Sequence, residues 1–477
     1  MNQMVEANLG SFRDPANRVY HHQDPATGGK RVLRGIDQIT LNNFNALAEE
    51  DFFQKLLENG RIVRTTLLDA DDPVASEILR DGWSGVMEHE TVPFVSYPYE
   101  WTFSMLKDAA LLQLSILEAA LENGWTLKDA TPFNIQFIGC RAVFIDLPSF
   151  EPWTEGEPWV GYRQFCSMFL IPLMLRSHLG LDHTTILRSN IDGLAPTEAI
   201  KYFTGLKRLK KGVLSHVALP ASVEKSIASK ERDDAPAKLR KHRKQSVAMV
   251  VGLVQSLINL VKRLKSDISH TDWSQYDQTH TYKEDDFDAK KSFVEKYAGT
   301  ADRKVIWDIG CNTGTFSKVC SPHCDTVLSV DGDHDAVDKL YLREKESDRS
   351  NLLPMVMDLS NISPGQGWAG RERAAFDDRG SPDLVLCLAL IHHIRLSANI
   401  PNSFFLRWLR SLNSDVILEF VTRQDEMVVK LLTNKKEQYL DYDLPQFIEE
   451  CGLFFDIEDR ISLKNGRREL FFLTPKA

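Results

Sequence analysis

The sequence predicts a two-domain α/β protein in which a mostly parallel sheet follows an α+β domain. The chain has 477 residues, well beyond the roughly 100–200 residues of one typical domain. From residue 271 onward, short apolar runs typical of strands alternate with helical stretches, which favours a parallel sheet covered by helices on both faces. We expect an α+β domain over 1–200, a basic helical linker region over 201–270 and the parallel-sheet domain over 271–477.

The composition excludes several classes of protein. Hydrophobic residues make up 43% of the chain and charged residues 26%, which excludes a wholly disordered, collagen-like or multi-span membrane protein. The 57 Lys and Arg against 67 Asp and Glu give a net charge of −10, which is unsuited to coating nucleic acid non-specifically. The seven cysteines are sparse and odd in number, and Met1 to Tyr20 lacks the apolar run of a secretory signal. We therefore expect a cytoplasmic protein with free thiols.

Residues 246–261 form an apolar segment with basic flanks. The segment is shorter than the roughly 20 residues that a membrane span requires, and it contains Gln255 and Asn259. We therefore expect no stable membrane span and interpret the segment as a buried or inter-domain helix. A helix lying on a membrane surface is the alternative.

The first strand of the parallel-sheet domain, Lys304–Asp308, runs into a glycine-containing turn that opens a helix. Gly310 and Gly314 let a ligand approach the backbone where a side chain would collide, and Asn312 is a residue type that tolerates positive φ. Ligands in open α/β sheets bind beyond the carboxyl ends of the strands, where this turn would lie. The turn matches neither G-x-G-x-x-G nor G-x-x-x-x-G-K-[ST], which argues against a dinucleotide or a triphosphate ligand.

Acidic residues end the next two predicted strands. Thr326–Val330 ends at Asp331, which follows the turn at the spacing of an acid that accepts both hydroxyls of a ribose. Leu353–Met357 ends at Asp358 and Leu359, where a carboxylate and a neighbouring amide could contact an adenine edge. The three strand ends therefore predict an adenosine-binding crevice.

The remaining strand-like runs bring the predicted sheet to seven strands. A nearly continuous apolar run over 382–390, typical of a central parallel strand, is followed by His392 and His393. Glu419 lies near the carboxyl end of the fifth strand. The last three runs cover 415–420, 455–461 and 468–473.

This set of strand ends resembles a class I S-adenosylmethionine-dependent methyltransferase with its Rossmann-like sheet. The first motif of that family, acidic-x-Gly-x-Gly-x-Gly, is matched at Asp308, Gly310 and Gly314, and the chain departs from it at Asn312. The resemblance implies S-adenosylmethionine as cofactor, Asp331 as the ribose-binding acid, and the acid after the third strand beside the adenine. It also implies that Leu388 and its neighbours flank cofactor and substrate. The candidate cofactor-binding residues are therefore Asp308, Gly310, Asn312, Gly314, Asp331, Asp358, Leu359 and Leu388.

Three strings resemble, more narrowly, bacterial nodulation-associated (NoeA-like) methyltransferases. They are YPYEW at 97–101, LALIHH at 388–393 and LEFV at 418–421. This narrower resemblance covers both halves of the chain and leaves the substrate open.

The cofactor that the resemblance implies suggests how catalysis would proceed. A sulfonium methyl is already activated, so the protein mainly aligns a nucleophile with it and shields the site from water. Where the acceptor is a hydroxyl, a nearby general base helps, and the candidates are His392, His393 and Glu419. The alternative is that the histidine pair caps the following helix and packs against it.

The cysteines do not predict a metal site. Three cysteines and one histidine lie around the first helix of the sheet domain, and their spacing is not that of a paired zinc motif. We interpret this group as a surface turn with incidental thiols. Cys387 lies in mid-strand, where we expect a core residue. The residues of that group are Cys311, Cys320, His323 and Cys324.

Part of the N-terminal half resembles the protein-kinase and aminoglycoside-phosphotransferase fold. Asp129 is followed by Asn134 and, after a strand, by Asp146, in the order of the catalytic loop and metal-binding strand of that fold. No His-Arg precedes Asp129, Leu-Pro replaces Phe-Gly after Asp146, and the hairpin ending at Arg34 offers only Lys30 or its basic neighbours to hold a phosphate. The alternative is a helix-plus-hairpin domain in which Asp129 and Asn134 satisfy backbone groups of turns.

These observations favour an S-adenosylmethionine-dependent methyltransferase whose acceptor is a hydroxyl of a small molecule or saccharide, recognised or covered by the N-terminal domain. One alternative is methylation of tRNA or protein, with the basic tracts at 207–211 and 238–244 as a docking strip. Those tracts are also typical of a solvated helix face. The other alternative is a scaffold that binds the cofactor without turnover.

Overall fold

The structure is a computed structural model that describes residues 5–24, 28–230, 245–266, 284–347, 351–433 and 438–476. It divides into two compact units. The first comprises 1–137, 142–267 and 365–374, and the second comprises 138–141, 268–364 and 375–477. The structure differs from the expectation of a linker, because 201–230 and 245–266 belong to the first unit. The basic tract at 238–244 lies outside the described residues.

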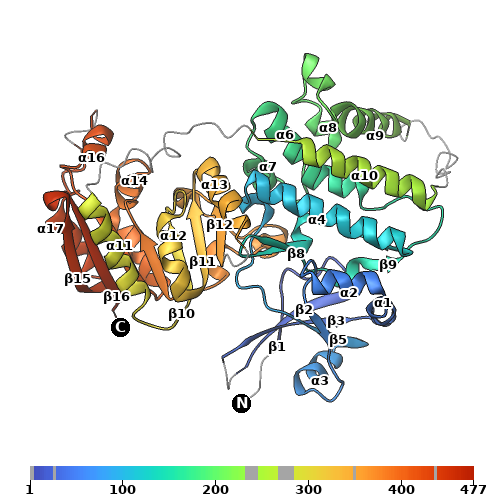
Figure 1. Ribbon diagram of the computed structural model, residues 1–477, viewed down its shortest axis with the longest axis horizontal. Helices are drawn as coiled ribbons and strands as arrows, with labels where there is room; N and C mark the ends of the chain where they lie inside the picture. The colour runs from blue at the N-terminus through green and yellow to red at the C-terminus, as the bar shows by residue number, and fades with distance from the viewer. Residues whose placement is uncertain are drawn as a thin grey trace. The chain divides into compact units, whose positions relative to one another are not determined.

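An antiparallel sheet of five strands opens the first unit (Figure 1). Buried Leu33 and Val86 of this sheet pack with Ile78 of a covering helix. In sheet order, the strands are β1 (Val5–Ala7), β2 (Asn17–Gln23), β3 (Lys30–Ile36), β5 (Gly85–His89) and β4 (Thr65–Leu67). The helices that accompany them are α1 (Gln38–Ala48), α2 (Asp51–Glu58) and α3 (Pro73–Leu79).

The rest of the first unit is largely helical. Two short strand pairs follow its longest helix, α4 (Phe103–Glu122). They are β6 (Trp125–Leu127) with β9 (Phe150–Pro152), and β7 (Ile135–Ile138) with β8 (Arg141–Phe144). The remaining α-helices are α5 (Tyr162–Phe165), α6 (Ile171–Leu179), α7 (His183–Ser189), α8 (Pro196–Ala199), α9 (Leu219–Lys230) and α10 (Val247–Arg263).

Helix α10 contains the apolar segment at 246–261, and it packs along α4. Its buried residues recur at helical spacing, and they include Val250, Val254 and Leu257. Lys107 of α4 donates from Nζ to the carbonyls of Lys262 and Leu264 at 3.0 and 2.9 Å. The helix therefore buries one apolar face within the first unit, while its opposite face is exposed. Among the described residues, we find no helix with both the length and the apolar character to cross a bilayer.

The second unit is built on one sheet of seven strands. The sheet order is β12-β11-β10-β13-β14-β16-β15, in which the first five strands are parallel and β16 pairs antiparallel with both β14 and β15. This confirms the predicted Rossmann-like, mostly parallel sheet. Its strands are β10 (Arg303–Ile309), β11 (Cys324–Asp331), β12 (Leu352–Val356), β13 (Leu384–Cys387), β14 (Asp415–Val421), β15 (Phe455–Leu463) and β16 (Arg468–Pro475).

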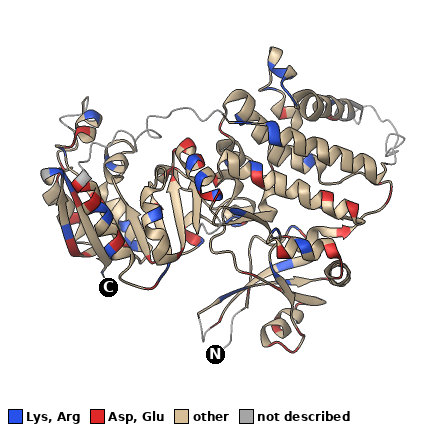
Figure 2. Cartoon of the chain, in the orientation of Figure 1, with Lys and Arg blue, Asp and Glu red and all other residues tan. Residues whose placement is uncertain are grey.

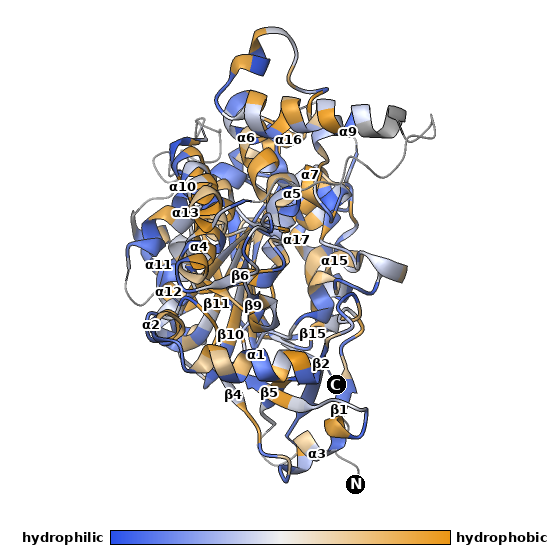
Figure 3. Cartoon of the chain, turned by 90° about the vertical axis from the view of Figure 1, so that its right-hand side faces the viewer, coloured by the Kyte–Doolittle hydropathy of each residue, from blue (hydrophilic) through white to orange (hydrophobic). Residues whose placement is uncertain are grey.

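Helices cover this sheet because its strands are apolar on both faces. Ile306, Val327 and Leu384 form one buried layer with residues of the helices that precede and follow β10. Figure 2 shows charged residues gathered on the helices of this unit, and Figure 3 shows hydrophobic colour along β11. The helices are α11 (Glu284–Ala298), α12 (Thr315–Cys320), α13 (His334–Lys345), α14 (Ile391–Leu396), α15 (Asn402–Ser411), α16 (Glu426–Leu431) and α17 (Leu444–Cys451).

The order of the strands decides where a ligand can enter. From β10 the chain moves outward through β11 to β12, and it then returns to place β13 on the other side of β10. The crevice at such a reversal, beyond the carboxyl ends of the strands, is where open α/β sheets bind ligands. β13 ends at Cys387, short of the predicted run to 390, because the backbone turns away at Ala389, where φ is +52°.

Candidate functional site

A cavity of about 350 Å³ lies at this reversal in the second unit. All of its walls come from segments that follow the carboxyl ends of four neighbouring parallel strands: β10, β11, β12 and β13. The lining residues are Gly310, Asp331, Gly332, Met357, Asp358, Leu359, Ser360, Leu390, His393, Ile394, Ser397 and Ala398. The volume is within the range of about 300–1,000 Å³ that is usual for small-molecule sites.

The turn after β10 forms one wall of the cavity. The backbone amides of Gly310 and Cys311 donate to the carbonyl of Val330 on β11 at 2.8 and 3.0 Å, which holds the turn against the sheet. Gly310 has φ of +83° and Asn312 has φ of +51°, as their residue types predicted. Of the three loop candidates, Gly310 lines the cavity, whereas Asn312 and Gly314 do not.

Gly314 serves packing at the start of α12. Its φ is +78°, and a Cβ added there would lie 2.6 Å from Leu340 of α13. A glycine is therefore required by the approach of the turn to α13. Packing against α13 thus explains why residue 314 is a glycine, whether or not a cofactor binds.

Asp331 is oriented by the backbone on both sides of the crevice. Its carboxylate accepts the N–H of Asn312 at 2.8 Å and the N–H of Asp333 at 2.8 Å. Burial raises the pKa of Asp331, and these two hydrogen bonds oppose the rise. A carboxylate fixed in this way keeps lone pairs that can accept hydroxyl groups from the cavity.

Asp308, next to the last residue of β10, does not line the cavity. Its side chain is buried and accepts the Oγ–H of Ser317 on α12 at 2.6 Å, which ties the end of β10 to the following helix. Burial raises the pKa of Asp308 to about 6, an effect that the Ser317 hydrogen bond partly offsets. The candidate is therefore a positioning residue for the turn.

The segments after β12 and β13 complete the walls. Asp358 accepts the N–H and the Oγ–H of Ser360 at 2.8 and 2.7 Å, and with Leu359 it lines the cavity as expected. Leu388 is in the hydrophobic core, and Leu390 lines the cavity in its place. This corrects the prediction for Leu388, and the positive φ at Ala389 between the two leucines explains the difference.

The two adjacent histidines differ in environment. His393 lines the cavity, whereas His392 is 2% exposed and its buried Nδ1 forms no hydrogen bond within the described residues. Their ring centroids are 4.1 Å apart. Burial, and then the charge of Arg468, lowers the pKa of His393. His393 therefore remains a candidate base, and His392 is a packing residue behind it.

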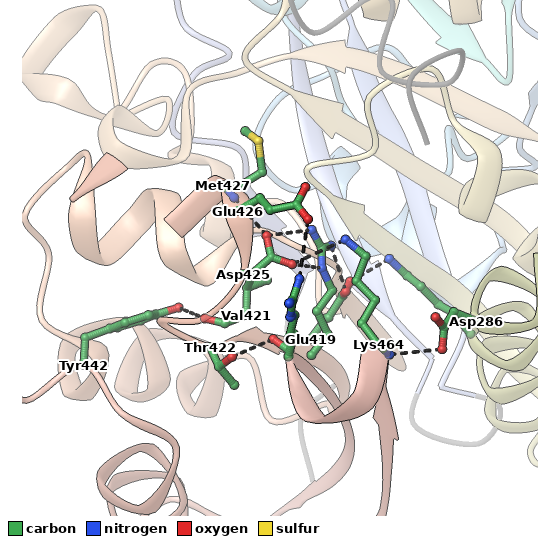
Figure 4. Close-up of polar contacts among 12 residues, drawn as sticks. Asp286, Glu419, Val421, Thr422, Asp425, Glu426, Met427, Tyr442 and Lys464 are labelled. Atoms are coloured by element: carbon green, nitrogen blue, oxygen red, sulfur yellow. Dashed lines mark hydrogen bonds and ion pairs between the residues drawn. The ribbon is translucent and has the colours of Figure 1, made fainter. Parts of the chain in front are cut away.

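Glu419 lies in a buried network of ion pairs (Figure 4). Its carboxylate is 2.6 Å from Nζ of Lys290 on α11 and 3.1 Å from a guanidinium nitrogen of Arg468 on β16. Arg468 also pairs with Asp425 at 2.8 Å, and Lys464 approaches Asp425 at 3.6 Å. Glu419 does not line the cavity, and two cations hold its charge. This environment favours a positioning role, and the role of Glu419 as a base stays a prediction.

The N-terminal candidates do come together in the first unit. Asn134 donates from Nδ2 to Asp146 at 3.1 Å, and Asp146 is also paired with Arg34 of β3. Burial, and then the charge of Asp146, raises the pKa of Asp129. Arg34 is thus the basic residue of the hairpin that reaches this group, not Lys30. The kinase-like fold stays a prediction.

Sequence reasoning missed several walls of the cavity. Gly332 and Met357 each adjoin a residue that was predicted to line the site. Including the neighbours of each predicted residue at the strand ends would have found them. Ile394, Ser397 and Ala398 lie in and after α14, and no local pattern distinguishes them from other residues of that helix. The seven cysteines are free thiols, and Cys387 is buried as expected.

Solved structures are similar to part of the chain, and a curated protein is similar to nearly all of it. No family model matches the chain. Among solved structures, the N-methyltransferase NodS from Bradyrhizobium japonicum WM9 is 11% identical with a TM-score of 0.30, over 40% of this chain and 98% of that chain. A SAM-dependent methyltransferase from Aquifex aeolicus is 12% identical with a TM-score of 0.30, over 43% of this chain and 100% of that chain.

A curated relative covers nearly all of the chain. The nodulation protein NoeA of Rhizobium meliloti (strain 1021) is 31% identical over 465 residues, which span 97% of this chain and 94% of the relative. Both units lie within this match, in agreement with the narrower resemblance of the sequence. The chain belongs to the NoeA family of nodulation proteins.

Proposed function

We propose that this protein is an S-adenosylmethionine-dependent methyltransferase, and that its acceptor is a hydroxyl of a small molecule or saccharide. The observation that carries the proposal is the cavity at the strand-order reversal, into which Asp331, Asp358 and the turn at Gly310 converge from neighbouring strands. A cavity so placed suits an adenosine-containing ligand.

The residues present fit the cofactor. Asp331 would accept the ribose hydroxyls, because its carboxylate faces the cavity while backbone amides fix its orientation. Asp358 and Leu359 would contact the adenine edge from the next strand end. Gly310 and Gly332 would let the ligand approach the backbone, since neither presents a side chain to the cavity.

The chemistry requires little of the protein beyond alignment and a base. When bound, S-adenosylmethionine supplies a methyl group that is already activated for displacement by a nucleophile. His393 is the base of this proposal, because it lines the cavity and its lowered pKa keeps the imidazole neutral and able to take a proton near pH 7. The wall residues Leu390 and Ile394 would exclude water.

Calorimetry with S-adenosylmethionine and S-adenosylhomocysteine tests the cofactor. We expect both to bind, and Asp331→Ala to weaken binding by at least about tenfold, the loss of a charge-assisted hydrogen bond. Asp325→Ala is the matched control, because Asp325 lies exposed at the other end of the same strand. Binding that is unchanged in Asp331→Ala would overturn this site.

A labelled methyl donor tests the acceptor. Extract is incubated with the protein and the labelled cofactor, and the label is then located in small-molecule, saccharide, lipid, RNA or protein fractions. Label in the small-molecule or saccharide fraction supports the proposal. Label in RNA or protein would favour the alternative acceptors, and cofactor binding without any transfer would favour the scaffold.

A further inference from the structure

The first unit carries an exposed surface that combines leucines with cations, which we call the basic leucine turn (201–223). At its centre is a 3₁₀ turn, η5 (Gly205–Leu209), in which Leu206 is 83% exposed and Leu209 is 68% exposed. Two leucines this exposed within one short turn are unusual on a protein surface, and contiguous exposed apolar patches mark interaction sites.

Further exposed apolar side chains follow in the next helix. Leu214 is 50% exposed, Leu219 is 64% exposed and Val223 is 57% exposed. They follow at intervals of five and four residues through a π-helical turn, η6 (Leu214–Ala218), into α9, which is the spacing that keeps side chains on one face of each helix type. Figure 3 shows the hydrophobic colour of this face along α9.

The charge of the basic leucine turn is uniformly positive. The sequence from Lys201 to Val223 contains no Asp or Glu, although the whole chain has a net charge of −10. Lys201 is paired with Glu198 at 2.6 Å, so its charge is offset. Four further exposed cations remain around the two leucines of η5: Lys207, Arg208, Lys210 and Lys211.

Buried residues on each side of the turn fix its position, and with it the exposed leucines. Phe203 and Val213 are 0% exposed. Arg208 donates from Nε to the carbonyl of Phe203 at 3.1 Å. Gly212 has φ of +85°, and a Cβ there would lie 2.7 Å from Leu260 of α10, so the backbone packs closely at the base of the turn. The fold therefore presents the leucines to the surroundings in a fixed place.

We propose that the basic leucine turn docks the protein on an anionic lipid bilayer. Leucines that enter the boundary between headgroups and acyl chains, with lysines and arginines at the phosphates, are the combination that a membrane surface binds. Each cation contributes roughly 1 kcal/mol near an anionic leaflet. RNA would use the cations and leave Leu206 and Leu209 without a partner, since its recognition relies on phosphate contacts and aromatic stacking.

Sedimentation of the full chain with lipid vesicles tests this proposal. We expect binding to phosphatidylcholine vesicles that contain phosphatidylglycerol, and little binding to vesicles of phosphatidylcholine alone. The double variant Lys207→Ser/Lys210→Ser should weaken binding roughly thirtyfold, the effect of two cations. Leu206→Ser/Leu209→Ser should weaken it by roughly tenfold or more.

Matched variants on the second unit control for charge and hydropathy. Lys291→Ser/Lys318→Ser removes two exposed lysines, and Leu440→Ser/Leu453→Ser removes two leucines that are 72% and 69% exposed. Both variants should bind vesicles as the wild type does. Circular dichroism and the melting temperature establish that every variant folds.

Four outcomes would overturn the proposal. The first is equal vesicle binding by the wild type and both turn variants, and the second is no binding of the wild type to anionic vesicles. The third is retention of tRNA that is lost in Lys207→Ser/Lys210→Ser but kept in Leu206→Ser/Leu209→Ser, which would assign the surface to nucleic acid. A wild-type dimer that Leu206→Ser/Leu209→Ser converts to a monomer would likewise assign it to a second copy of the chain.

Discussion

The protonation of His393 is set by its burial and by the charge of a neighbouring arginine. His392 packs against it at 4.1 Å between ring centroids and fixes the ring, while burial and the charge of Arg468 lower its pKa. A general base works in its deprotonated form, so a lowered pKa extends the active range toward lower pH. Arg468 is itself held by Glu419 and Asp425, so the buried ion pairs influence the cavity through this residue.

We predict that His393→Gln lowers kcat by about 10²- to 10⁴-fold while S-adenosylhomocysteine still binds, because the variant loses the proton acceptor. In the wild type, kcat/KM should be constant above about pH 6.5 and fall as the pH is lowered through the imidazole pKa, which lies below that usual value. His323→Gln, outside the cavity lining, should leave the rate unchanged. A rate that is also unchanged in His393→Gln would remove the histidine from the mechanism.

At the scale of elements, the turn between β10 and α12 connects sheet packing to the cavity. Its amides bond to β11, its buried Asp308 holds Ser317 of α12, and Gly314 passes close to Leu340 of α13. The same short segment thus meets three neighbouring elements. A change in its packing would move Gly310, which lines the cavity.

We predict that Gly314→Ala lowers the free energy of unfolding more than Gly466→Ala does. Both glycines have positive φ, of +78° and +83°, so both variants lose roughly 1 kcal/mol in backbone conformation. Only at Gly314 would the new Cβ meet Leu340, at 2.6 Å, and such overpacking costs about 1–3 kcal/mol more. Urea unfolding followed by a probe in the second unit measures the difference, and equal losses would contradict it.

At the scale of the whole second unit, the network around Glu419 joins segments that are distant in sequence. Lys290 and Glu419 are 129 residues apart, and Glu419 and Arg468 are 49 residues apart. Removing one partner of a buried ion pair leaves the other charge uncompensated, and this costs much more than the pair itself contributes. The network therefore fixes how α11, β14 and β16 assemble.

We predict that Glu419→Gln destabilises the second unit by about 3–5 kcal/mol. Glu426→Gln is the control, because Glu426 is 65% exposed and pairs with Arg467 at 3.4 Å, so its loss should cost no more than about 1 kcal/mol. Denaturant unfolding measures both variants. A stable Glu419→Gln that binds cofactor but has lost kcat would instead restore Glu419 as the base.

The sequence alone determined the features of this protein that depend only on short segments of the chain. Acids and glycines at strand ends predicted the parallel sheet and the places of Gly310, Asp331, Asp358 and Leu359, because residue type and strand pattern are local. Only the tertiary structure decided that Leu388 is in the core, that 201–230 and 245–266 join the first unit, and that Glu419 is held by Lys290 and Arg468. Those outcomes depend on which distant segments pack together, and packing partners leave no signal in the local pattern of one chain.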